Sequence, residues 1–74
     1  MSPEKLTMMA NQIARFFAHR GPEHAPEDIA DHLRKFWDPR MRRAIIAYVE
    51  AGGSGLDPLA AAAVALLAED ATVS

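Results

Sequence analysis

The apolar positions of the chain recur at helical spacing in four segments, which proline or glycine residues separate from one another. In the first segment these positions are Leu6, Met9, Ala10, Ile13 and Phe17. In the second they are Ile29, Ala30, Leu33, Phe36 and Trp37, and in the third Met41, Ala44, Ile45 and Tyr48. In the fourth they are Leu59, Ala63, Leu66 and Leu67. The pattern predicts an all-α fold, a small four-helix domain with helices at about 3–19, 26–37, 39–51 and 58–71.

Proline and glycine set the expected helix boundaries. Pairs that place an N-cap residue before a proline, which suits the first helical position, are Ser2-Pro3, Asp38-Pro39 and Asp57-Pro58. A short loop over 21–25 is expected between the first two helices, because Gly21-Pro22 follows the first apolar pattern. Gly52–Gly55 is expected to stop the third helix and to form a flexible hinge. Whether the alanine-rich last helix packs on the other three is left open, since alanine favours helix but buries little surface.

The composition indicates one small soluble domain. The chain has 74 residues, no cysteine and a formal net charge of −2, so disulfides and thiolate metal sites are excluded as supports for the fold. The acidic balance argues against a general nucleic-acid binder. No apolar run approaches the roughly 18 residues of a membrane span, and the first residues lack the order of a signal peptide. We therefore predict a cytoplasmic protein.

The residue types that carry catalysis or bind metals are not arranged for that chemistry. No two of His19, His24 and His32 have the spacing that puts two ligands on one helical face. Acidic pairs such as Glu27/Asp28 are explained by the positive end of a helix dipole. No nucleophile stands beside a base, and Gly52–Gly55 lacks the lysine of a phosphate loop. We predict no catalytic residue, no metal ligand and no cofactor-binding residue.

The corner between the second and third helices is the candidate for recognition. Phe36 and at least part of Trp37 are expected to anchor the junction, while Asp38-Pro39 fixes its angle. Basic residues across the corner are Arg34, Lys35, Arg40, Arg42 and Arg43. Three interpretations of this cluster are open: a solvated face, a protein interface and a DNA-binding helix-turn-helix. The absence of glycine from the turn argues against the helix-turn-helix. Because arginine and tryptophan are enriched at interfaces, the predicted partner-binding residues are Trp37, Arg40, Arg42, Arg43, Met8 and Ile46.

Several stretches also resemble a known family. They are Met9–Ala14, Phe16-Phe17, Ile29–Leu33, Phe36–Arg42 and Leu56–Leu59, of which the Phe-Trp-Asp-Pro-Arg-Met-Arg segment is the most specific. In this order and spacing they resemble the delta subunit of cytoplasmic NAD-dependent formate dehydrogenases. The resemblance covers nearly the whole chain and transfers no catalytic residue.

The resemblance implies a small accessory subunit of a molybdenum- or tungsten-dependent enzyme that oxidises formate and reduces NAD. In that family the metal–pterin cofactor and iron–sulfur clusters belong to the alpha subunit and the flavin to the beta subunit. The expected partners are therefore the large subunits, above all the alpha subunit, with no nucleic acid and no membrane. A transient maturation chaperone for molybdenum-cofactor insertion is the alternative, and a small DNA-binding regulator is a third. A homodimer of the isolated chain is left open.

Overall fold

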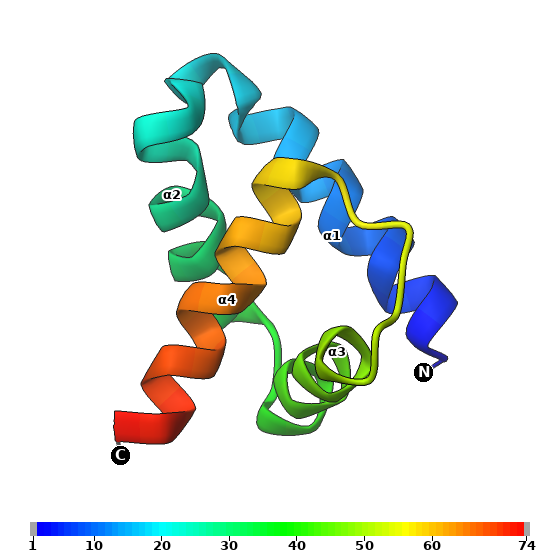
Figure 1. Cartoon of the computed structure of the whole chain (residues 1–74). Helices are drawn as coiled ribbons and strands as arrows, with labels where there is room; N and C mark the ends of the chain where they lie inside the picture. The colour runs from blue at the N-terminus through cyan, green and yellow to red at the C-terminus, as the bar shows by residue number, and fades with distance from the viewer. Residues whose placement is uncertain (1, 74) are drawn as a thin grey trace.

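The chain folds into helices joined by short connections (Figure 1). The computed structural model describes residues 2–73, and side chains up to residue 70. The elements are α1 (Pro3–Phe17), the 3-10 turn η1 (Ala18–Arg20), α2 (Gly21–Phe36), α3 (Pro39–Glu50) and α4 (Pro58–Val73). The described residues contain no strand, so the predicted all-α class is confirmed.

Two of the predicted helix starts are capped as the sequence indicates. The Ser2 hydroxyl accepts a hydrogen bond from the Lys5 amide at 3.2 Å, and the Asp38 carboxylate accepts one from the Met41 amide at 3.0 Å. A proline occupies the beginning of each helix, where its missing N–H leaves no bond unmade. The α2–α3 corner is therefore fixed by the local sequence.

The boundary between α1 and α2 differs from the prediction. Helix α1 ends at Phe17, and α2 begins at Gly21 rather than Pro26, so the loop predicted over 21–25 was wrong. Gly21 makes the turn with a φ of 82°, which glycine adopts readily. Pro26 then lies inside α2, where it removes a single hydrogen bond near the helix start. Burial of Ala25 in the core shows why this first turn stays helical despite the proline.

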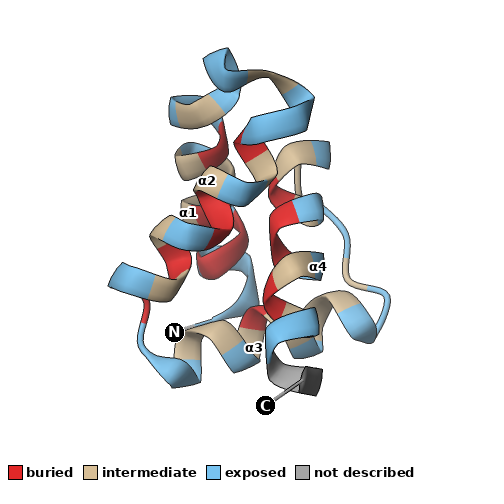
Figure 2. Ribbon diagram, turned by 90° about the vertical axis from the view of Figure 1, so that its left-hand side faces the viewer, coloured by how far each residue is buried: buried red, intermediate tan, exposed pale blue. Residues whose placement is uncertain are grey.

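Helix α4 packs on the other helices and lies against α2 over most of its length (Figure 1). Its small side chains allow this close approach, since Ala60 and Ala63 are fully buried beside Val64 and Leu67. Figure 2 shows the buried residues on the facing sides of the helices. The largest fully buried side chains are Leu6, Ile29, Leu33, Ile45 and Val64. The alanine-rich α4 thus contributes to the core because its small side chains let it pack closely on its neighbours, although each of them buries little surface.

The segment between α3 and α4 is tied down at both ends. Gly52 has a φ of 89°, and the Gly53 amide donates to the Tyr48 carbonyl at 2.8 Å, which confirms the predicted glycine stop. The Asn11 side chain on α1 donates to the Gly55 carbonyl at 2.9 Å. Its amide oxygen accepts from the Asp57 amide at 2.8 Å. One side chain of α1 therefore sets where α4 begins.

Candidate functional site

The two neighbouring aromatic residues of the corner have opposite environments. Trp37 is 5% exposed and belongs to the core, whereas Phe36 is 71% exposed. The reason is the backbone: Trp37 is the C-cap of α2 with extended dihedrals (φ −91°, ψ 136°), so the chain leaves the helix and directs the indole inward. The prediction that Phe36 is a buried anchor was wrong. The indole of Trp37 holds the corner together, and its burial does not fit direct contact with a partner.

The three predicted arginines of α3 differ in exposure. Arg40 and Arg43 are exposed, whereas Arg42 is half-buried. Within the described part of the chain, the buried Arg42 Nε has no hydrogen-bond partner. Arg40 lines a hollow of about 320 Å³ together with Leu6, Asp38, Met41 and Ala44. The corner thus presents cations on more than one side of α3.

The charges of α3 run against its helix dipole. The first turns carry arginines and no acid, and the last residue, Glu50, is acidic where a basic residue would be favoured. The dipole acts within the terminal turns, so Arg40 and Glu50 each cost about 0.3–1 kcal/mol relative to the favoured sign, while the Asp38 carboxylate at the N-cap has the favoured sign. Arg43 and Glu50 have no ion-pair partner among the residues that the structure describes. Helix stability therefore does not explain these charges.

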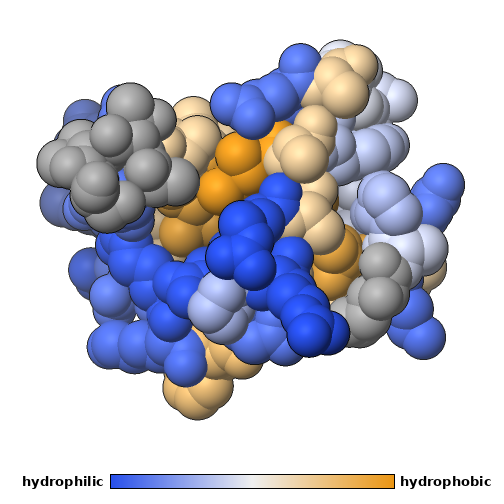
Figure 3. Space-filling model, turned by 90° about the horizontal axis from the view of Figure 1, so that it is seen from below, coloured by the Kyte–Doolittle hydropathy of each residue, from blue (hydrophilic) through white to orange (hydrophobic). Residues whose placement is uncertain are grey.

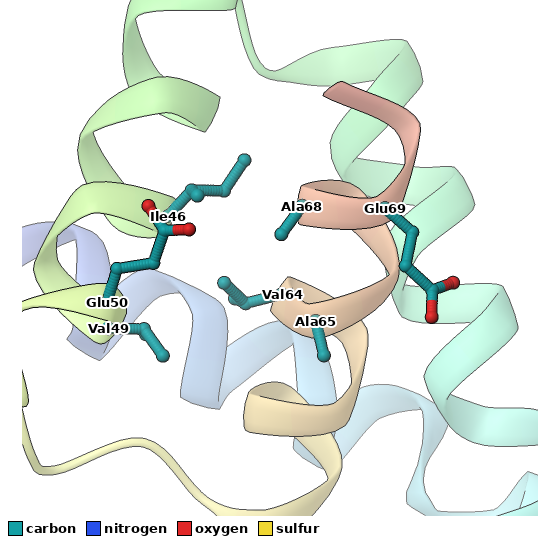
Figure 4. A pocket seen from close by; sticks show the side chains of 7 residues that line it. All are labelled: Ile46, Val49, Glu50, Val64, Ala65, Ala68 and Glu69. Carbon is teal, nitrogen blue, oxygen red and sulfur yellow. The ribbon is translucent and has the colours of Figure 1, made fainter. Parts of the chain in front are cut away.

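Ile46 forms one wall of an apolar groove between α3 and α4. The groove has a volume of about 420 Å³, and its lining residues are Ile46, Val49, Glu50, Val64, Ala65, Ala68 and Glu69. Figure 4 shows Ile46 and Val49 on α3 facing the α4 residues across an open space. The Glu50 side chain lies beside Ile46 at the edge of the groove, while Glu69 points away from α3 (Figure 4). Seen from below, the molecule has an orange apolar band bordered by blue hydrophilic side chains (Figure 3).

Met8 is separate from the other predicted contact residues. It lies on α1 and is 60% exposed. By helical phase it lies on the side of α1 away from the buried Ala10, as the sequence pattern indicates. The structure brings Arg42, Arg43 and Ile46 together on α3, and does not bring Met8 to them.

A row of rings across α1 and α2 was missed by the sequence reading. The rings of Phe16 and Phe17 meet edge to face, with centroids 5.3 Å apart. His32 lies between Phe17 (6.0 Å) and Phe36 (4.7 Å), which completes the row. Phe16 is 72% exposed, so both ends of the row reach solvent. The adjacent aromatic residues Phe16 and Phe17 could have indicated the ring row in the sequence. Helical spacing instead assigned both of them to one widened buried face.

Three ion pairs involve other titratable side chains. Arg20 pairs with Asp28 at 2.7 Å, and Arg34 pairs with Asp70 at 2.5 Å. Lys35 and Asp31 form the predicted pair one turn apart, at 3.0 Å. Among the described residues, no group of three or more His, Asp or Glu side chains is placed to hold a metal ion.

The comparison with protein families decides the relationship. Residues 5–64 match the model of the NADH-dependent formate dehydrogenase delta subunit, FdsD. The chain belongs to the FdsD family. No curated protein and no solved structure gives a significant match. The matched range includes α1, η1, α2 and α3 and the start of α4, and therefore the corner, the ring row and most of the groove.

Membership in the FdsD family agrees with the resemblance that the sequence motifs carry. A delta subunit of a formate dehydrogenase associates with other subunits, so surfaces for a protein partner are expected on this chain. None of the helices described here is long and apolar enough to cross a membrane.

Proposed function

We propose that the chain is a non-catalytic accessory subunit that binds the large subunits of an NADH-dependent formate dehydrogenase and stabilises the complex. Membership in the FdsD family is the observation that carries the proposal. The exposed Met8, Phe16 and Phe36 support it, because exposed large apolar side chains are a common feature of protein–protein contact surfaces. The alpha subunit, in the cytoplasm, is the proposed contact.

The start of α3 is the proposed point of first contact. Arg40 and Arg43 are exposed there, and neither takes part in capping the helix or in building the core. Arginine forms planar, paired hydrogen bonds with carboxylates, so these side chains suit an acidic patch on a partner. Trp37 supports this contact indirectly, since its burial fixes the position of α3.

Co-expression with the large subunits tests the function. A tagged copy of this chain should co-purify with them in a constant ratio, and omission of the chain should lower the amount of assembled, formate-oxidising enzyme. If the large subunits assemble to the same level without the chain and never co-purify with it, the proposal is wrong. A chain bound only to cofactor-free enzyme and absent from the mature enzyme would indicate a maturation chaperone instead.

A charge reversal locates the contact. The double substitution Arg40→Glu/Arg43→Glu should weaken co-purification at low salt, because it places acids where the partner is expected to be acidic. The matched control is Lys5→Glu/Arg15→Glu, which changes net charge equally at two exposed cations of α1 that have no ion-pair partner among the described residues. Equal loss in both variants would show that net charge, rather than the start of α3, governs binding.

A further inference from the structure

The α3–α4 groove is an apolar space that the fold itself does not fill. On the α4 side its wall consists of Val64, Ala65, Ala68 and Glu69, and the two alanines are too small to interdigitate with Ile46 and Val49 on α3. Packed helices in proteins normally fill such a space with side chains from both sides. A side chain from outside the chain therefore has room to enter between Ile46 and Ala65 (Figure 4).

Along α3, arginines stand about one turn before Ile46, and Glu50 lines the groove about one turn after it. The second acid of the lining, Glu69, points away from α3 (Figure 4). Arg42, Ile46 and Glu50 follow one another at four-residue intervals, so they form one stripe along α3. Arg43 stands next to the first of them, two turns or about 10 Å from Glu50 along the helix axis. Their order is opposite to the one that the helix dipole favours. Along this stripe a cation is followed by an apolar residue and then by an anion. A complementary partner helix would carry an anion, an apolar residue and a cation at the facing positions.

Arg42 is the half-buried cation at this end of the stripe. Its Nε is buried and has no acceptor among the described residues. Leaving a buried donor unpaired is unfavourable, because the group loses its hydration without gaining a hydrogen bond. A carboxylate brought to this end of the groove would pair with the exposed Arg43.

We infer that the groove receives one branched apolar side chain from a helix of a large subunit, flanked by an acid toward Arg42 and Arg43 and by a base toward Glu50. This inference rests on the proposed function and names the surface that performs it. The charges match across a helix pair, while the groove supplies the buried contact that gives such interfaces their affinity.

A second copy of this chain fits the groove less well. Arg43 and Glu50 are placed symmetrically about Ile46 and Ala47, so two antiparallel α3 helices would pair their charges. The exposed face of α3 between those charges, however, offers only Ala47. Ile46 is half-buried in the groove of its own chain, so it is not free to enter the groove of another. A second copy would therefore match the charges of α3, but it has no apolar side chain free to enter the groove.

Two variants test the inference against matched controls. Ala65→Phe fills the groove from an exposed position, and Ala62→Phe places the same ring at another exposed position of α4, about one turn before Ala65, that does not line the groove. The exchange Arg43→Glu/Glu50→Arg reverses the charge pattern without changing net charge. Co-purification of the tagged chain with the large subunits should fall at least tenfold for Ala65→Phe and for the exchange, and remain at the wild-type level for Ala62→Phe. Circular dichroism should show the exchange variant folded, because its charges now agree with the helix dipole.

The outcomes separate this inference from the proposed function. If the wild-type chain binds the large subunits and both groove variants bind equally well, the groove is not the contact and the inference is overturned, while the accessory role stands. If the wild-type chain does not bind them at all, the proposed function fails first. If the isolated chain sediments as a dimer and Ala65→Phe makes it a monomer, a second copy occupies the groove and the inference is wrong.

Discussion

The ring row and the α3–α4 groove are both apolar surfaces, but they differ in how far the chain already satisfies them. In the row, Phe17, His32 and Phe36 contact one another, and the neighbouring acids Asp28 and Asp31 are paired with basic side chains. In the groove, Ile46 faces alanines across an open space, and Glu50 has no ion-pair partner within the described chain.

This difference shows that exposure alone is a poor guide to a docking surface. Phe16 and Phe36 are 72% and 71% exposed, yet their rings already contact neighbouring rings. The groove exposes smaller side chains, but it combines a cavity with unpaired charges. Unsatisfied groups, rather than exposed area, therefore make the groove the stronger candidate.

The largest expected effect separates the ring row from the core. Trp37→Ala should lower the free energy of unfolding by about 3–5 kcal/mol, because it leaves a large cavity under the corner. Phe36→Ala, at the adjacent position, should change it by no more than about 0.5 kcal/mol. Urea unfolding followed by circular dichroism measures both. Similar losses of unfolding free energy in the two variants would show that the ring row is part of the core. The contrast between the ring row and the groove would then be wrong.

An intermediate effect tests how the groove is held open. Asn11→Ala removes two hydrogen bonds that position the start of α4, and should cost about 1–3 kcal/mol at roughly 0.5–1.5 kcal/mol for each bond. The same variant should weaken binding to the large subunits more than its loss of stability explains, since it frees one wall of the groove. Amide hydrogen exchange should rise in residues 53–60 and remain unchanged around His32. Faster exchange around the ring row would show that the two surfaces are not independent.

The smallest expected effect sharpens the groove itself. Ala65→Leu should raise the free energy of unfolding by about 0.5–1 kcal/mol, because its side chain buries apolar surface against Val49 and Ile46. Ala62→Leu, at an exposed position of α4 that does not line the groove, should leave stability unchanged. Thermal unfolding of both variants measures the difference. A stabilisation by Ala62→Leu as large as that by Ala65→Leu would mean that helix propensity, rather than groove filling, is responsible.

Local chemistry by itself determined the helical class, the caps at Ser2 and Asp38 and the stop at Gly52. These features depend on residues within a few positions of each other, so sequence spacing is enough to predict them. The cationic start of α3 and the exposure of Met8 also followed from spacing.

Only the tertiary structure decided which apolar residues are covered. Phe36 and Trp37 are neighbours in one apolar pattern, and the change from helical to extended backbone at Trp37 sends one into water and the other into the core. Periodicity likewise could not show that α2 begins before Pro26, since that depends on the packing of Ala25. The groove depends on how α3 and α4 are placed, and Asn11 on a third helix holds the segment in which α4 begins. Helical phase names the side of a helix on which a residue lies, whereas long-range contacts decide whether anything lies opposite.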